Sequence, residues 1–149
     1  TSGHGALSEN YYLDDGAYLA VKLIIAAAKA RAEGRTLADL ISKLRHPAEA
    51  REIRIKVLGT ENVRAYGQEV LTAFEERARA KGISIASPSY EGVRIIMNDG
   101  WALLRMSLHD PNMPLNIEAD AAGGADVIER TVKELLTGFD ALDFSGFHV

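Results

Sequence analysis

The chain has 149 residues with a formal net charge of -4, and 47% of its residues are hydrophobic. This acidic balance argues against a nucleic-acid partner held by bulk electrostatics, and the absence of cysteine excludes disulfides, thiolate metal sites and a cysteine nucleophile. No apolar run is long enough to span a bilayer and no signal peptide is recognisable, so we expect no membrane partner and a cytoplasmic location.

The first 47 residues contain two helix patterns and no strand pattern. Asp14 or Asp15 is placed to cap the first helix, which Gly34 ends. Thr36 and Asp39 form a capping signal for a second, shorter helix. Apolar residues of the first helix recur at helical spacing, namely Leu13, Ala17, Ala20, Val21, Ile24 and Ala28.

From about residue 51 the pattern changes to β-α-β-β-β-α. Ile53, Ile55 and Val57 alternate with charged residues, as in a half-buried strand. An amphipathic helix follows over about 61–81, and Asp99-Gly100 forms the turn of a hairpin between two apolar strands. A further strand lies in "MPLNIEAD". The last helix has Val127, Ile128, Val132 and Leu135 on its predicted buried side, and the tail after it is predicted to be loosely ordered.

This order predicts an α+β fold, in which an antiparallel sheet carries two helices on one face. The chemistry is expected where the second hairpin strand ends, in "LLRMSLHDP". Side chains two apart share a face of a strand, so Arg105, Ser107 and His109 converge there if the extended geometry persists, and all three suit an anion such as phosphate. The alternative is that Arg105 pairs with Asp110 or Glu118, Ser107 caps the turn and His109 is merely exposed.

The opening "TSGHG" is a second candidate. Two glycines around a His make a tight loop in which backbone and short side chains approach a ligand closely. His4 would serve there as a general acid or base near neutral pH. The alternative is a flexible terminal segment without a role. The Asp14-Asp15 pair is interpreted as a helix cap rather than a metal site.

Taken together, these segments resemble the C-terminal part of an α-D-phosphohexomutase, most like the bacterial phosphoglucomutase/phosphomannomutase group. "TSGH" matches the end of the family's sugar-binding loop, and "ENYYLDDGAYLAVKLI" resembles the segment after it. "DGWALLRMSLHDP" lies where the family has its phosphate-binding loop, usually Arg-x-Ser-(Gly or Asn)-Thr-x-Pro. The chain departs from that loop at three positions. Leu108 replaces a small residue, His109 replaces the usual Thr, and Asp110 stands where a Glu is common.

The resemblance implies a domain organisation. Residues 1–47 would be the C-terminal remnant of the α/β third domain, which binds the sugar. Residues 48–149 would be the fourth, phosphate-binding domain, with a two-layer fold like that of the TATA-box-binding protein. The chain would then be a fragment of the enzyme and inactive alone.

The resemblance also implies the chemistry. A phosphoserine of the first domain would exchange its phosphoryl group with a hexose phosphate through a bisphosphate, assisted by Mg²⁺ on aspartates of the second domain. In this fragment Arg105, Ser107 and His109 would hold the phosphate that does not react. Ser2 and Gly3 would contact the sugar, and His4 would be the candidate acid or base.

Two further interpretations concern partners. Small α+β domains also serve as non-enzymatic binding or regulatory modules, which is the alternative function. In addition, the first helix lacks a sheet on which to pack, so its apolar stripe is expected to be buried against another surface. We therefore expect self-association through residues 17–28.

Overall fold

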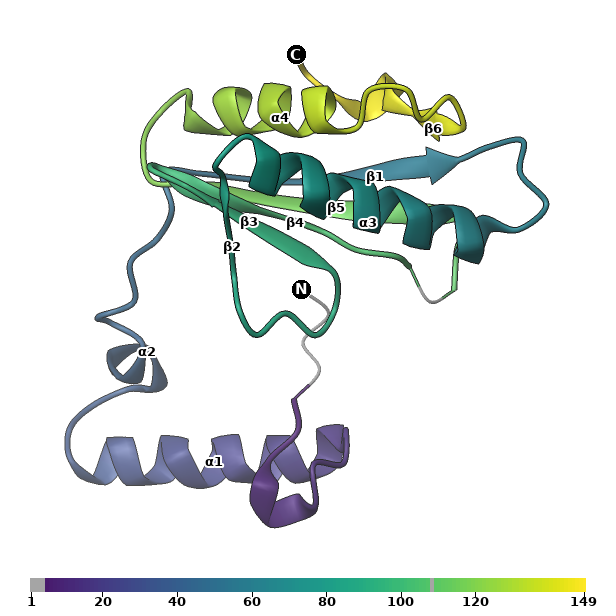
Figure 1. The fold of residues 1–149 in the computed structure, drawn as a ribbon. Coiled ribbons are helices and arrows are strands. Elements are labelled where there is room, and N and C mark those ends of the chain that lie inside the picture. The colour runs from purple at the N-terminus through teal and green to yellow at the C-terminus, as the bar shows by residue number, and fades with distance from the viewer. Residues whose placement is uncertain (1–4, 108) are drawn as a thin grey trace. The chain divides into compact units, whose positions relative to one another are not determined.

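Figure 1 shows a computed structural model of the chain, which describes residues 5–107 and 109–149. The chain divides into two compact units, Thr1–Arg45 and His46–Val149. The predicted elements are distributed between them as the sequence patterns suggest. In its described residues the first unit has helices and one isolated β-bridge, between Ala6 and Asp14, and the second unit has a sheet with helices.

The first unit is built on α1 (Gly16–Ala32), which follows a short 3₁₀ turn, η1 (Ser8–Asn10). The carboxylate of Asp15 accepts the backbone N–H of Tyr18 at 3.0 Å, so Asp15 is the N-cap. The one-turn helix α2 (Leu37–Leu40) begins at the predicted capping box, in which the Asp39 carboxylate accepts the backbone N–H of Thr36 at 2.6 Å. It is shorter than the sequence pattern predicts because Ile41 already leaves the helix.

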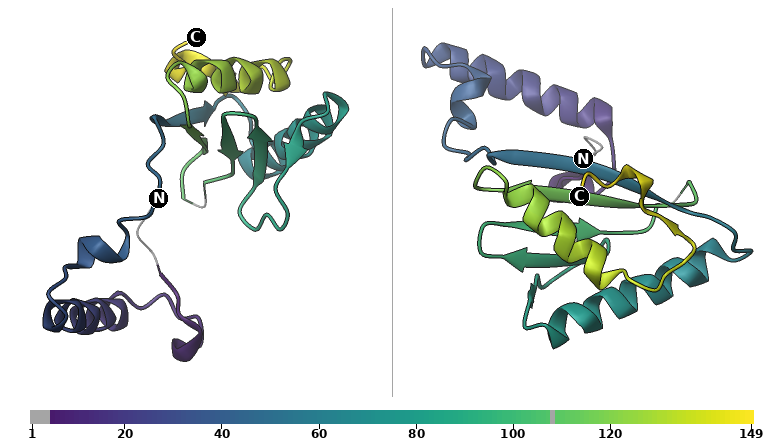
Figure 2. Two further views of the ribbon diagram at one scale, coloured as in Figure 1. Left: turned by 90° about the vertical axis from the view of Figure 1, so that its left-hand side faces the viewer. Right: turned by 90° about the horizontal axis from the view of Figure 1, so that it is seen from above.

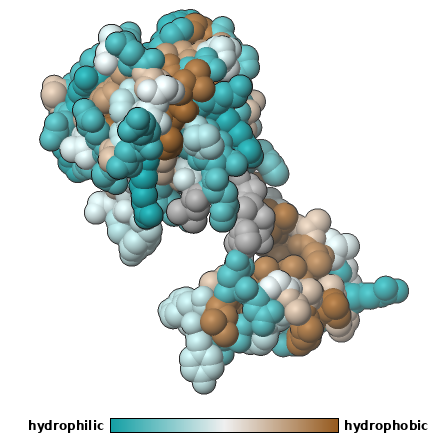
Figure 3. All heavy atoms as spheres, turned by 90° about the vertical axis from the view of Figure 1, so that its right-hand side faces the viewer, coloured by the Kyte–Doolittle hydropathy of each residue, from teal (hydrophilic) through white to brown (hydrophobic). Residues whose placement is uncertain are grey.

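The first unit leaves most of its apolar side chains in contact with solvent. Within residues 5–45 only Ala30 is buried. Ile24 of α1 is 68% exposed and Val21 is 54% exposed. Figure 3 shows hydrophobic side chains, in brown, on the surface of this unit. A helix that is apolar on several sides is normally covered by other elements.

The second unit contains an antiparallel sheet, which in the described residues has the strand order β2-β3-β4-β5-β1-β6 (Figures 1 and 2). The two-layer α+β fold predicted from the sequence is therefore confirmed. The strands are β1 (Glu49–Val57), β2 (Ser84–Ile85), β3 (Val93–Met97), β4 (Gly100–Leu104), β5 (Asn112–Ala119) and β6 (Leu142–Asp143).

Two helices cover one face of this sheet (Figure 2). The helix α3 (Val63–Ala80) packs against β2 and β3, and α4 (Gly124–Leu135) packs against β5, β4 and β1. The core lies between the layers and is formed by alternate residues of the strands. Its fully buried members include Ile55, Phe74, Ile95, Leu104, Leu115 and Val132.

The hairpin of β3 and β4 has its turn one residue earlier than predicted. Gly100 pairs with Met97 across the hairpin, so the two-residue turn is Asn98-Asp99. A Cβ at position 100 would overlap the carbonyl oxygen of Glu118 on β5. Gly100 is therefore needed for the close approach of β4 to β5, rather than for the turn itself.

Two predictions for the C-terminal region are wrong. Val127 is 52% exposed, whereas Ala125 and Glu129 face the core from α4. The tail is also ordered, because Leu142–Asp143 pairs with the end of β1 and a 3₁₀ turn, η2 (Phe144–Gly146), follows. The aromatic side chains of this tail pack against the core, which gives it a fixed place.

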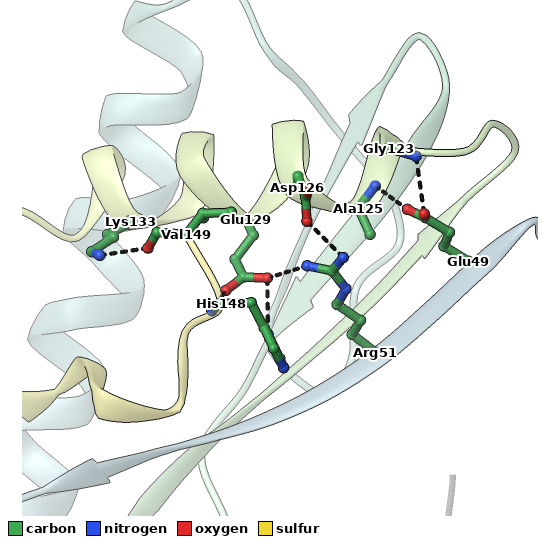
Figure 4. A network of polar contacts seen from close by, with 9 residues as sticks. All are labelled: Glu49, Arg51, Gly123, Ala125, Asp126, Glu129, Lys133, His148 and Val149. Atoms are coloured by element: carbon green, nitrogen blue, oxygen red, sulfur yellow. Dashed lines mark hydrogen bonds and ion pairs between the residues drawn. The ribbon is translucent and has the colours of Figure 1, made fainter.

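A buried carboxylate holds the tail, α4 and β1 together (Figure 4). Glu129 is fully buried and lies 2.7 Å from the guanidinium of Arg51 on β1. The same guanidinium lies 2.6 Å from Asp126, and these two hydrogen bonds, Asp126 first, raise the pKa of Arg51. Glu129 also accepts the backbone N–H of His148. We call Arg51, Asp126, Glu129 and His148 the Glu129 network.

Candidate functional site

The strand geometry of β4 continues beyond its last residue, Leu104. The backbone N–H of Arg105 donates to the carbonyl of Pro114 at 3.1 Å, and that of Ser107 donates to the carbonyl of Asn112 at 3.0 Å. These bonds keep the register in which Leu104 pairs with Leu115 of β5. Because the backbone remains extended, Arg105 and Ser107 lie on the same side of the strand, as the sequence predicts.

The chain then turns at Ser107. Its hydroxyl oxygen accepts the backbone N–H groups of His109 at 3.3 Å and Asp110 at 3.1 Å. Ser107 therefore caps the turn, as in the alternative interpretation, but its own hydroxyl hydrogen remains available for a ligand. The N–H groups of residues 109 and 110 are already bonded to this oxygen, so they are not free donors for a ligand.

The three predicted residues line one cleft of about 770 Å³. This volume lies in the range of sites for small organic ligands. The cleft is located where β4 runs past the beginning of β3, since Val93 pairs with Leu104 and no residue of β3 lies beside Ser107. Its walls are residues 105–107 and 109–111, the segment 90–93 and one side of α3. The geometry thus brings Arg105, Ser107 and His109 to a common space, although His109 comes from the turn and not from the strand.

Charges on the cleft are only partly compensated. Arg105 makes no ion pair within the described part of the chain, so the predicted pairing with Asp110 or Glu118 is not formed there. Arg105 is half-buried beside the cleft and His109 is exposed. Carboxylates of Glu91 and Asp110 line the same cleft. A guanidinium without an internal partner is a suitable binding group for a phosphate dianion.

The sequence analysis missed two residues of this cleft. Arg64 reaches it from the first turn of α3. Gly92 forms its wall next to Arg105, and a Cβ there would overlap the carbonyl oxygen of Leu104. An isolated glycine before a strand is a signal for such a close approach, and Gly92 was therefore recognisable. Arg64 carried no comparable signal, because an exposed arginine on a helix is ordinary.

Ser2, Gly3 and His4 lie outside the described residues. Among residues 5–107 and 109–149, no group of His, Asp and Glu side chains is arranged to hold a metal ion. In the same residues, no helix has the length and apolar character required to cross a membrane.

The fold is similar to that of a solved protein. The crystal structure of a phosphoglucomutase/phosphomannomutase family protein from Burkholderia thailandensis superimposes with a TM-score of 0.64 and 21% sequence identity. The similarity covers 93% of this chain and 27% of that protein, so the chain spans about a quarter of its length. At this identity the likeness establishes the fold. No family model matches the sequence, and no curated protein matches it.

Proposed function

We propose that this chain is the C-terminal part of a phosphohexomutase, an isomerase that interconverts hexose 1-phosphate and hexose 6-phosphate. The observation that carries the proposal is the convergence of Arg105, Ser107 and His109 on one cleft. It is supported by the fold, which is shared with a phosphoglucomutase/phosphomannomutase family protein over 93% of this chain.

In the proposed reaction, a phosphoserine elsewhere in the full-length enzyme transfers its phosphoryl group to the free hydroxyl of the hexose monophosphate. The resulting bisphosphate then returns its other phosphoryl group to the serine, so that the phosphate has moved between positions 1 and 6. Phosphoryl transfer depends mainly on positioning and charge stabilisation. The phosphate that does not react at a given step must therefore be held firmly.

We assign this holding role to the cleft of the second unit, which corresponds to residues 48–149 of the predicted fourth domain. The guanidinium of Arg105 would donate paired hydrogen bonds to two phosphate oxygens. The Ser107 hydroxyl would donate a further one while its oxygen keeps the turn closed. His109 would donate from its ring and would bind most strongly when protonated.

The remaining roles lie outside the described residues or outside this chain. Ser2 and Gly3 would contact sugar hydroxyls, and His4 would act as acid or base near the reacting oxygen. Mg²⁺ would neutralise charge on the transferring phosphoryl group. As the resemblance implies, its ligands would be aspartates of the second domain, outside this chain.

The proposal is tested by NMR titration of the 149-residue chain with glucose 1-phosphate and, separately, with inorganic phosphate. We expect amides of residues 105–110 to shift first with both ligands, and no isomerisation of glucose 1-phosphate by the chain alone. If these amides remain still at millimolar ligand while others move, the site is assigned wrongly. Turnover by the isolated chain would contradict the division of roles.

We further propose that α1 associates with a second copy of the chain through residues 17–28. The support is the exposure of its apolar residues, such as Ile24 and Val21. Sedimentation velocity should show a concentration-dependent dimer that Ile24→Glu abolishes. Ala32→Glu is the matched control, because it adds the same charge at an exposed position near the helix end. A monomer at all concentrations would contradict association.

A further inference from the structure

The helix α3 rests directly on the segment that carries the predicted phosphate ligands. Gly67 of α3 is buried, and a Cβ at this position would overlap the side chain of Met106. Met106 lies between Arg105 and Ser107 in sequence and points to the opposite side of the strand, where it packs against the core. The contact of Gly67 with Met106 therefore fixes the first turns of α3 beside the cleft.

Arg64 lies one turn before Gly67 on this helix. Residues three apart are neighbours on a helix surface, so Arg64 stands on the side of α3 that faces the cleft. It lines the cleft together with Arg105, Ser107 and His109. Its side chain is exposed.

The other two arginines of α3 have partners, and Arg64 differs from them. Arg77 donates to the carbonyls of Leu135 and Thr137 at 2.7 and 2.8 Å. Arg79 lies 2.6 Å from Glu75 in an ion pair. Arg64 has no ion pair within the described residues. A cation in the first turn of a helix is also disfavoured by the helix dipole.

The charges that line the cleft bear on the role of Arg64. Three carboxylates line the cleft, and that of Glu75 is paired with Arg79. Glu91 and Asp110 have no such partner in the described part of the chain. If Arg105 were the only arginine of the cleft, the carboxylates of Glu91 and Asp110 would outnumber it, and the cleft would repel a dianion. The guanidinium of Arg64 makes the number of positive charges equal to the number of unpaired carboxylates.

We infer that Arg64 is a second guanidinium of the phosphate site, contributed by α3, and that it contacts the phosphate group of a sugar phosphate from the side opposite to Arg105. This inference rests on the proposed function and adds a ligand to its site. Two planar donor groups on different oxygens of one phosphate would select a terminal phosphate monoester over a monoanion such as a carboxylate.

The test compares Arg64→Ala, Arg64→Lys and Arg105→Ala in the full chain by titration with inorganic phosphate and with glucose 1-phosphate. We expect Arg64→Ala to lower the affinity for both ligands roughly five- to tenfold. Arg64→Lys should lower it less, because lysine keeps the charge but lacks the paired N–H donors of the guanidinium. Arg130→Ala is the matched control, since Arg130 is an exposed arginine of α4 outside the cleft. It should leave both affinities unchanged.

The outcomes separate this inference from the proposed function. If Arg105→Ala weakens binding but Arg64→Ala does not, the inference is wrong and the phosphate site remains. If the unaltered chain binds neither ligand at residues 105–110, the site itself is wrong and Arg64 has no role in it. If Arg130→Ala weakens binding as much as Arg64→Ala, the effect is one of net charge and the inference fails.

Discussion

Two arginines of the second unit illustrate opposite uses of a guanidinium. Arg51 reaches from β1 to Glu129 and Asp126, at 2.7 and 2.6 Å, and lies inside the Glu129 network. Arg105 continues β4 and lines an open cleft without an ion pair in the described residues. Both belong to one sheet, Arg51 to β1 and Arg105 to the segment that continues β4, and β5 lies between these two strands. The two arginines differ in the partners that the fold gives them.

The difference indicates which arginine is available to a ligand. A charge that is taken out of water needs a partner of opposite sign, and Glu129 and Asp126 satisfy Arg51 within the fold. Nothing in the described residues satisfies Arg105, which remains partly accessible to solvent. We therefore expect Arg51 to contribute to stability alone and Arg105 to contribute to phosphate binding alone.

The largest expected effect follows from Arg51→Ala. This change leaves the Glu129 carboxylate fully buried without its guanidinium. Removal of one partner of a buried ion pair costs about 3–5 kcal/mol in free energy of unfolding, because the remaining charge is uncompensated. Urea unfolding monitored by circular dichroism measures this cost.

Arg54→Ala is the control for that prediction. Arg54 lies on the same strand, and its ion pair with Glu52, at 3.0 Å, is exposed to solvent. Such surface pairs contribute about 0–1 kcal/mol. If Arg51→Ala lowers the free energy of unfolding no more than Arg54→Ala does, the Glu129 network does not stabilise the fold. The role assigned to Arg51 in the comparison with Arg105 is then wrong.

Arg105→Ala should give the reverse pattern. We expect the affinity for inorganic phosphate to fall about tenfold or more, since a charge-assisted pair of hydrogen bonds is lost. The free energy of unfolding should change by less than about 0.5 kcal/mol, because no partner within the described residues is left behind. Calorimetric titration and urea unfolding of the same sample measure both quantities. A large loss of stability with unchanged affinity would assign Arg105 to the fold.

Much of the sheet was predictable because local patterns decide it. Ile53, Ile55 and Val57 alternate with polar residues, and each is buried as the alternation requires. The same alternation predicted that Arg105 and Ser107 share a side of the strand, and the register beyond β4 has this geometry.

The wrong predictions concern residues whose environment is set by distant parts of the chain. Val127 was predicted to be buried, but Glu129 is buried instead, and its carboxylate is paired with Arg51, which is 78 positions away. The order of the tail likewise depends on distant residues, since Leu142–Asp143 pairs with the end of β1 and Phe144 and Phe147 pack against the core. Arg64 was missed for the same reason, since its place beside the cleft depends on the packing of Gly67 on Met106.

The smallest expected effect concerns Glu49, which lies on the same strand as Arg51 but caps a helix. Its carboxylate accepts the backbone N–H groups of Gly123 and Ala125, each at 2.9 Å, at the start of α4. These two bonds hold the pKa of Glu49 below its ordinary value of 4.5. A carboxyl group with a lowered pKa in the folded state stabilises the fold above its ordinary pKa, and this contribution is lost as the pH falls through the folded value.

Glu49→Gln should therefore lower the melting temperature slightly at pH 7, and the difference from the unaltered chain should disappear as the pH is lowered below 4.5. The two N–H groups are bound by different oxygens of Glu49. Gln has an NH2 donor in place of one of these oxygens and carries no charge to interact with the helix dipole. Glu69→Gln, at an exposed position of α3, is the control and should give no pH-dependent difference. Melting curves between pH 3 and 7 (about one unit apart) distinguish the two. If the difference in melting temperature between Glu49→Gln and the unaltered chain persists at low pH, Glu49 stabilises the fold through packing and not through its charge. Of the two residues of β1, only Arg51 would then act through an ionic contact.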